Sequence, residues 1–222
     1  KMTVIGSLAD IEKKSITSGN KYFVMRHGEA ESNVRSIVNS AMDERNKLTE
    51  KGQKDAHDAV EKFSSRKIDF IVTSPLPRAR QTAAIVAETL HIPQDRVIVD
   101  DRLREIGMGE FEAMSVDSYH AYFSSLAERF TKRPEGGENI MDVKKRLGSL
   151  LDETEGKYSK KTILLISHDS PIWQLFSVAR GWDMDHAIEN VHAHGASEFI
   201  KNAEIRSLPI SKLPRNSEYA LD

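Results

Sequence analysis

Short apolar runs alternate along this chain with longer stretches in which apolar residues recur every three or four positions. The short runs are typical of strands buried on both faces, and the longer stretches are typical of amphipathic helices. The pattern predicts strands at residues 22–25, 69–75, 97–103 and 161–168, with an edge or antiparallel strand at 190–200. It predicts helices within residues 4–15, 47–63, 78–92, 119–130, 139–155 and 170–180.

Three of these helices carry start signals. Ser7 and Thr49 are expected to be the N-caps of the first two helices, because a hydroxyl can accept a hydrogen bond from a free amide of the first turn. Pro171 is expected at the first helical position of the last one, where its missing N–H has no consequence.

The order of the predicted elements indicates the fold class. Strands that alternate with helices form a mostly parallel sheet with helices on both faces. We therefore expect an α/β protein, a three-layer sandwich, with its main domain at residues 20–201 and flanking segments at 1–19 and 202–222. In such sheets, ligands bind outside the carboxyl ends of the strands.

Composition narrows the function classes. The 222 residues include 32 Lys and Arg against 34 Asp and Glu, so the net charge of −2 offers no general attraction for nucleic acid or a membrane surface. The chain has no cysteine, which excludes disulfides, cysteine-ligated zinc and a thiolate nucleophile. No apolar run approaches the ~20 residues of a bilayer span. We expect a cytoplasmic protein.

Polar chemistry follows three of the predicted strands. Arg26 and His27 come directly after the first strand, Arg78 lies shortly after the second, and His168 ends the run at 161–168. If these strands are parallel neighbours, two histidines and two arginines meet in one pocket. Arginine binds phosphate oxygens bidentately, and a neutral histidine can attack phosphorus. The pocket therefore suits phosphoryl transfer in which cationic side chains stabilise the charge.

Such a reaction also needs an acid that protonates the leaving alkoxide. Glu105 follows a predicted strand and is the favoured candidate, while Glu110 and Glu112 remain alternatives on position. His192 and His194 could hold a metal on one strand face, but a structural role is favoured because no third ligand is in view. No metal site and no cofactor are expected.

Five ordered blocks of this sequence resemble the histidine phosphatase (phosphoglycerate mutase-like) superfamily. The blocks are RHGE at 26–29, SPxxRAxQTA at 74–83, LxE…G at 103–109, GGEN at 136–139 and the pair Ser167-His168. The resemblance runs from about residue 21 to residue 200 and implies a phosphoglycerate mutase-like fold. It also implies a histidine acid phosphatase-type enzyme that acts on a small phosphorylated molecule.

The same resemblance implies roles for individual residues. His27 would be the phosphorylated nucleophile, and Glu105 would be the proton donor. The rest of the catalytic and phosphate-binding set would be Arg26, Asn33, Arg78 and His168. Metal-independent hydrolysis of a phosphomonoester through a phosphohistidine is therefore expected.

Two positions depart from the family pattern. Asp169 stands directly after His168 where the family usually has glycine, and Ala113 stands where a glycine is common. Asp169 places a carboxylate near an anion site and could slow turnover or select an unusual substrate. Phosphoglycerate mutases carry a tryptophan after RHGE, which residues 30–47 lack, so hydrolysis is favoured over phosphotransfer.

The segment between Glu112 and Pro134 is expected to form a lid over the pocket. Its aromatic side chains could contact a leaving group, but ordinary helix packing is the favoured role. These side chains are Tyr119, His120, Tyr122, Phe123 and Phe130.

Both flanks resemble a second family. Residues 4–15 resemble a segment near the end of the editing insertion of isoleucyl-tRNA synthetases, and residues 202–222 resemble text that leads back to the catalytic core of some of those enzymes. These likenesses imply a phosphatase domain inserted in a synthetase, whose remaining chain would be its partner. The alternative is a non-catalytic or weakly active phosphate-binding insertion module.

Overall fold

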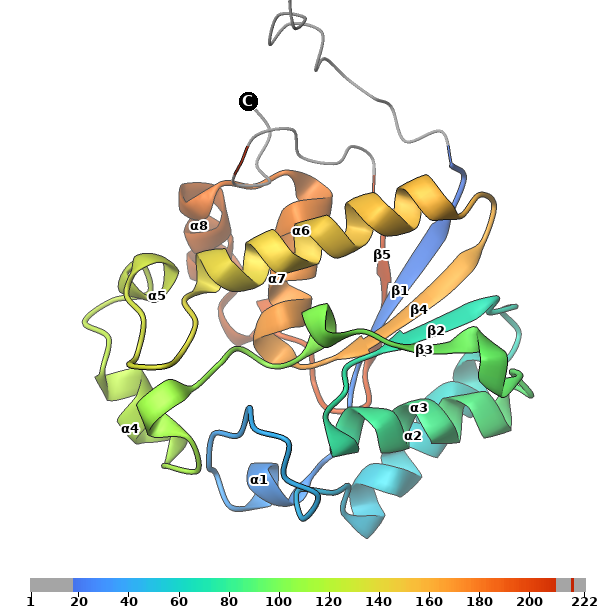
Figure 1. The fold of residues 1–222 in the computed structure, drawn as a ribbon, viewed down its shortest axis with the longest axis horizontal. Coiled ribbons are helices and arrows are strands. Elements are labelled where there is room, and N and C mark those ends of the chain that lie inside the picture. Colours follow the sequence, from blue (N-terminus) through green and yellow to red (C-terminus); the bar gives the residue numbers. More distant parts are fainter. Residues whose placement is uncertain (1–17, 211–216, 218–222) are drawn as a thin grey trace, which may run out of the picture.

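The computed structural model, which describes residues 18–210 and residue 217, is a three-layer α/β sandwich (Figure 1). Its five-stranded sheet has the order β3-β2-β4-β1-β5, and every pair is parallel except β1 with β5. The strands are β1 Lys21–Arg26, β2 Phe70–Thr73, β3 Val97–Val99, β4 Thr162–Ser167 and β5 Ile205–Leu208. The predicted fold class is confirmed.

Helices form the two outer layers. They are α1 Glu31–Val34, α2 Glu50–Phe63, α3 Pro77–Thr89, α4 Val116–Ala121, α5 Glu128–Thr131, α6 Ile140–Lys157, α7 Asp169–Arg180 and α8 Met184–His194. Short 3-10 turns lie at Gln94–Arg96, Asp101–Leu103, Gly109–Phe111 and Gly195–Glu198. α2 and α3 cover one face of the sheet, and α6, α7 and α8 lie over the other (Figure 1).

Alternation along the strands divides the buried side chains between the two faces. In β4, Ile163 and Leu165 belong to the core that contains α6 and α7, whereas Leu164 and Ile166 belong to the core that contains α2 and α3. Successive strand side chains point to opposite faces, so an unbroken apolar strand has to be covered on both. The apolar run in β4 therefore requires two helical layers.

The three predicted helix starts have different outcomes. Thr49 caps α2 by accepting a hydrogen bond from the Gly52 amide at 2.9 Å, as predicted. The helix expected at 170–180 is α7, which begins at Asp169, so Pro171 is its third residue and not its first. The helix predicted within residues 4–15, with Ser7 as its cap, lies outside the described residues.

The strand predicted at 190–200 was wrong. These residues continue α8 and the 3-10 turn after it. Asp183 caps this helix by accepting a hydrogen bond from the His186 amide at 2.9 Å. The free edge of β1 is instead paired with β5, so His192 and His194 lie on a helix and not on a strand face.

Two other elements are shorter than predicted. The strand expected at 97–103 stops at Val99, because the Asp100 carboxylate accepts from the Arg102 amide at 2.9 Å and starts a 3-10 turn. The helix expected over 119–130 is divided into α4 and α5. Between them, the Ser124 amide donates to the Glu128 carboxylate at 2.8 Å.

The sheet extends beyond residue 201. β5 lies in the segment expected as a flank, and it pairs Leu208 with Tyr22 at the start of β1. The two ends of the described domain therefore lie side by side, at the edge of the sheet opposite to the carboxyl ends of its parallel strands (Figure 1). Within the described part of the chain, no helix is long and apolar enough to cross a bilayer.

Candidate active site

The parallel pairing of β1 and β4 brings the two histidines together. Arg26 is paired with Ser167, so the residues that follow them, His27 and His168, leave the sheet side by side. The His27 amide donates to the Ser167 carbonyl at 3.1 Å, and the two imidazole centroids are 5.0 Å apart. Both side chains are buried, with exposed fractions of 2% for His27 and 0% for His168.

The hydrogen bonds of His27 define its tautomer. Nδ1 lies 2.7 Å from the Gly28 carbonyl, which can only accept, so Nδ1 carries the hydrogen. Nε2 then carries the lone pair, and it accepts a hydrogen bond from Arg78 Nε at 3.1 Å. The imidazole is thus oriented with its nucleophilic nitrogen beside a guanidinium.

Electrostatics keep both imidazoles neutral in the unliganded protein. Burial, followed by the charges of Arg78 and Arg26, holds the pKa of His27 well below its ordinary range. Burial and the same arginines lower the pKa of His168 as well. Burial lowers the pKa of Arg78 to about 10, which leaves it charged at neutral pH.

Arg78 is held in place from three sides. It is the second residue of α3, which starts with Pro77 at the carboxyl end of β2. Its Nη1 and Nη2 atoms donate to the side-chain and main-chain oxygens of Asn39, both at 2.9 Å. The buried Thr82 hydroxyl accepts from the Gly28 amide at 3.2 Å and donates to the Arg78 carbonyl at 2.8 Å. Thr82 therefore ties the histidine loop to the helix that carries the arginine.

A close backbone approach beside His27 requires glycine at two positions. A Cβ atom on Gly28 would lie 2.3 Å from the Gly52 carbonyl oxygen, and one on Gly52 would lie 2.0 Å from the Glu29 carbonyl oxygen. Neither contact is possible for a real side chain. The glycines of the RHGE block and of α2 thus let the loop after β1 pack against the start of α2.

Among the three candidate acids, Glu105 alone lines the cavity beside His27. Its Oε1 atom accepts from the Ile106 amide at 2.8 Å, and burial raises the pKa of its carboxyl. Glu112 binds the loop near the cavity instead, accepting from the Ser40 amide and hydroxyl. Glu110 is exposed and accepts from the Glu135 amide at 3.2 Å.

The cavity has a volume of about 300 Å³ and lies outside the carboxyl ends of the parallel strands. Asn33 lines it, and the Asn33 amide oxygen is occupied by the Ala30 amide at 2.9 Å, which leaves its NH₂ group to offer. From the predicted lid, Tyr119 and His120 line the cavity, so these two rings do face the site. Phe130, by contrast, packs in the core with an exposed fraction of 1%.

Of the two residues that differ from the family pattern, Asp169 lines the cavity. Its Oδ1 atom lies 3.4 Å from Arg26 Nη1, an atom that also donates to the Ile200 carbonyl at 2.8 Å. Burial raises the pKa of Asp169. The second departure, Ala113, adopts a left-handed backbone with φ of 64°, which is a conformation that favours glycine.

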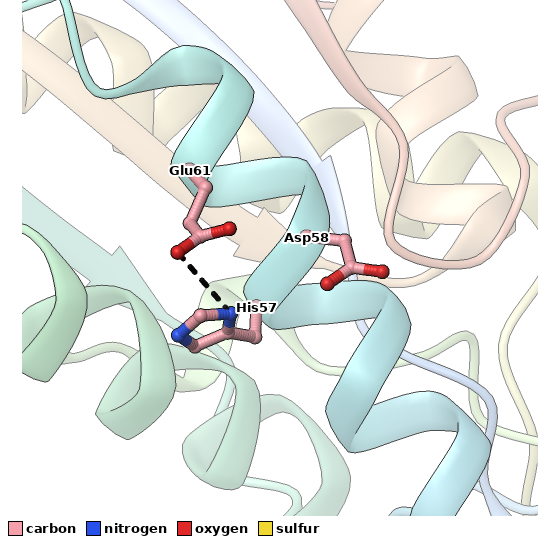
Figure 2. A group of neighbouring side chains, drawn as sticks. All are labelled: His57, Asp58 and Glu61. Carbon is pink, nitrogen blue, oxygen red and sulfur yellow. Dashed lines mark ion pairs between the residues drawn. The ribbon is translucent and has the colours of Figure 1, made fainter.

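One group of potential metal ligands lies together among the described residues, and it is remote from this chemistry. Figure 2 shows His57 and Glu61 facing each other across one turn of α2, with Asp58 beside them. His57 Nδ1 lies 3.9 Å from Glu61 Oε1, and the Asp58 carboxylate is bound by Lys54 at 2.6 Å. These are ordinary contacts of an exposed helix, and none of the three residues lines the cavity.

Sequence reasoning gave no role in the site to three of its contributors. The Ser74 hydroxyl lies 2.7 Å from His168 Nε2, and its position at the end of β2 is the same kind of signal that identified His27. Asn39, which anchors Arg78, and Arg129 of α5, which lines the cavity, lie outside any recognisable block. Only the packing of distant loops brings them to the site.

Comparisons with known proteins agree with this geometry. The family model for the histidine phosphatase superfamily, branch 1, matches residues 22–206. The chain is 28% identical to phosphoserine phosphatase 1 of Hydrogenobacter thermophilus over 169 residues, which are 74% of this chain and 78% of that protein. It is 29% identical to "Probable phosphoglycerate mutase GpmB" of Yersinia enterocolitica over 164 residues, which are 72% of this chain and 74% of that protein.

The fold is also similar to that of a solved structure. A mycobacterial glucosyl-3-phosphoglycerate phosphatase, in complex with VO3, superposes with a TM-score of 0.71 at 26% identity. The match covers 84% of this chain and 91% of that one. The chain therefore belongs to the histidine phosphatase superfamily, branch 1.

Proposed function

We propose that this chain hydrolyses a phosphomonoester through a covalent phosphohistidine at His27, without a metal ion. The observation that carries the proposal is the state of this imidazole, which is buried, neutral and oriented with the Nε2 lone pair beside Arg78. A lone pair that stays unprotonated among cations is suited to attack a phosphate. Relatives whose names describe them as phosphatases support the same chemistry.

The first step transfers the phosphoryl group to the protein. His27 Nε2 forms a bond to phosphorus while the bond from phosphorus to the leaving oxygen breaks. Arg26, Arg78 and His168 bind the remaining phosphate oxygens, and Asn33 contributes its NH₂ group. The Gly28 carbonyl, which accepts from Nδ1, stabilises the positive charge that the ring gains.

Glu105 gives its proton to the leaving alkoxide in this step. In the second step Glu105 takes a proton from the attacking water, whose oxygen forms a bond to phosphorus. The bond from phosphorus to His27 Nε2 breaks, which frees the imidazole and releases inorganic phosphate. Glu105 therefore has to be protonated when the substrate binds. Burial raises the pKa of Glu105, and a bound phosphate dianion raises it further by like-charge repulsion. We expect kcat/KM to fall as the pH rises through the pKa of Glu105 in the free protein, and kcat to fall through the higher pKa in the complex.

Glu105→Gln tests the proposal when it is assayed on two leaving groups. An alkoxide needs a proton in the transition state and nitrophenolate does not, so kcat/KM for ethyl phosphate should fall at least about tenfold more than kcat/KM for p-nitrophenyl phosphate. We compare kcat/KM because it ends with departure of the alcohol, before the water step that both substrates share. The matched control is Glu110→Gln, which removes an exposed carboxylate outside the cavity and should change neither rate. His27→Ala should abolish both activities, and EDTA should leave the wild-type rate unchanged.

Two results would contradict this scheme. Equal losses of kcat/KM on both substrates would make Glu105 a positioning residue and not the acid. A wild-type chain that binds inorganic phosphate but hydrolyses neither substrate would refute the enzyme and leave the phosphate-binding module as its function.

Phosphotransfer is the second candidate, and the relative named as a phosphoglycerate mutase supports it. Both activities share the phosphohistidine and differ in whether water or a second alcohol accepts the group. Incubation with 3-phosphoglycerate distinguishes them, because a hydrolase releases inorganic phosphate and a mutase produces 2-phosphoglycerate. We expect inorganic phosphate.

We also propose that the domain is embedded in a cytoplasmic isoleucyl-tRNA synthetase. Two features support this: the flanking sequences resemble that enzyme, and Tyr22 and Leu208 are paired neighbours in the sheet. A domain whose ends meet can be inserted in a host loop with little disturbance. The reading frame in the source genome tests the proposal. Synthetase core sequence in frame on both sides is expected, and any other sequence there refutes it.

A further inference from the structure

Two side chains of opposite charge line the cavity without pairing with each other. Asp169, at the start of α7, and Arg129, in α5, both contribute to its wall. Arg129 is close enough to lower the pKa of Asp169, yet the described residues contain no ion pair between them. The cavity wall therefore carries a carboxylate and a guanidinium that form no ion pair with each other.

Arg129 has no carboxylate partner of its own among the described side chains. Its Nε atom is buried without a hydrogen bond, and its guanidinium lies 5.8 Å from the centroid of the Tyr119 ring. Burial raises the pKa of Tyr119, so its hydroxyl stays neutral at physiological pH. A guanidinium in this position is suited to bind a carboxylate of the substrate, since the geometry of the fork matches two oxygens.

Among the described residues, Asp169 forms an ion pair with Arg26 alone. Its nearest cation is Arg26, and its Oδ1 atom accepts no hydrogen bond. The other charged groups that influence it are Arg129, Arg206 and His120. Arg206 is already bound by Glu204 at 2.6 Å, and burial lowers the pKa of His120, which keeps that ring neutral.

Phosphate binding changes this balance. Arg26 Nε is buried without a hydrogen bond and can take a phosphate oxygen, which places a dianion on the same guanidinium as the half-buried Asp169 carboxylate, and the like charges repel each other. A positive group on the leaving alcohol would remove this repulsion if it bound next to Asp169. A neutral leaving group would leave this repulsion in place, so Asp169 disfavours the binding of substrates with such a group.

We propose that the cavity selects phosphomonoesters whose leaving alcohol carries an ammonium group and a carboxylate, with Asp169 binding the ammonium and Arg129 binding the carboxylate. The inference rests on the phosphatase activity proposed above and adds its substrate class. A cavity of about 300 Å³ is large enough for a phosphorylated amino acid of this kind. Asp169 and Arg129 are specificity-determining residues in this scheme, and the chemistry at phosphorus is unchanged.

Four alkyl phosphates of similar size test the two charges separately. O-phosphoserine carries both charges, phosphoethanolamine only the ammonium, 2-phosphoglycolate only the carboxylate, and ethyl phosphate neither. Each kcat/KM is divided by the value for ethyl phosphate in the same variant. This ratio cancels any effect that a substitution exerts through Glu105 or the phosphate pocket. In the wild type, O-phosphoserine should have the highest ratio.

The two variants should act on different substrates. Asp169→Asn should lower the ratio about tenfold for O-phosphoserine and phosphoethanolamine, and it should not lower the ratio for 2-phosphoglycolate. Arg129→Met should lower the ratio for O-phosphoserine and 2-phosphoglycolate but not for phosphoethanolamine, and Arg129→Lys should recover part of the loss. Asp117→Asn and Lys132→Met remove the same charges outside the cavity wall and should leave all ratios unchanged.

Separate outcomes identify which idea fails. If Asp169→Asn changes all four substrates equally, or the wild type prefers none of them, this inference is overturned while the phosphatase stands. If the wild-type chain hydrolyses neither the four alkyl phosphates nor p-nitrophenyl phosphate, the phosphatase activity is refuted, and the proposed substrate class is refuted as well.

Discussion

Thr82→Val should uncouple the histidine loop from the arginine helix. The Thr82 hydroxyl is buried and joins the Gly28 amide, at 3.2 Å, to the Arg78 carbonyl, at 2.8 Å. Valine keeps the shape and the β-branch of threonine but has no hydroxyl. The Arg78 carbonyl keeps its place in the helix, whereas the Gly28 amide is left in a buried position without an acceptor.

The expected cost follows from that one orphaned amide. A buried donor without a partner costs about 1–3 kcal/mol of folding free energy. Catalysis should suffer as well, because Gly28 also supplies the carbonyl that orients His27. Small displacements of a reacting group lower rates steeply. We therefore expect kcat/KM for p-nitrophenyl phosphate to fall by about tenfold.

Thr82→Ser is the matched control, since it keeps the hydroxyl and removes only a methyl group. It should lose about 1 kcal/mol of stability, the value of one buried methyl, with activity within about twofold of the wild type. Urea denaturation measures the free energy of unfolding, and steady-state kinetics measures kcat/KM. The reasoning is refuted if the valine variant loses no more activity than the serine variant.

Two further predictions concern stability. Gly52→Ala should destabilise the fold by at least about 3 kcal/mol in the same urea assay, because its Cβ would lie 2.0 Å from the Glu29 carbonyl oxygen. Gly156→Ala is the control: its Cβ would have nothing within 4 Å, and the variant should stabilise α6 by about 0.5–1 kcal/mol. Glu105→Gln should raise the melting temperature at pH 7 and have little effect at pH 4. Because burial raises the pKa of Glu105, the native state binds this proton more tightly than the unfolded chain, so the ionised carboxylate costs stability only above its ordinary pKa of 4.5. Equal effects of Glu105→Gln at both pH values would contradict this assignment.

Local sequence determined which segments bear the chemistry. The unbroken apolar runs of β1 and β4 identify buried parallel strands, and the polar residues directly after them, His27 and His168, are recognisable in one dimension. The Thr49 cap of α2 is equally local, because a cap needs only its own hydroxyl and an amide three residues away. Such features depend on neighbours in the chain, and a sequence displays those directly.

Tertiary structure decided which charged groups meet. Asn39 reaches Arg78, and Arg129 of α5 reaches the cavity, because segments distant in sequence pack together, and no periodicity marks either residue. Glu105, Glu110 and Glu112 lie close together in sequence, and the folded chain places Glu105, but not the other two, in the cavity wall. The strand beside β1 proved to be β5 and not residues 190–200, because the Asp183 cap commits that segment to a helix while 205–208 fills the sheet edge. Long-range pairing of this kind depends on which segments compete for one edge or one charge, and only the folded chain resolves that competition.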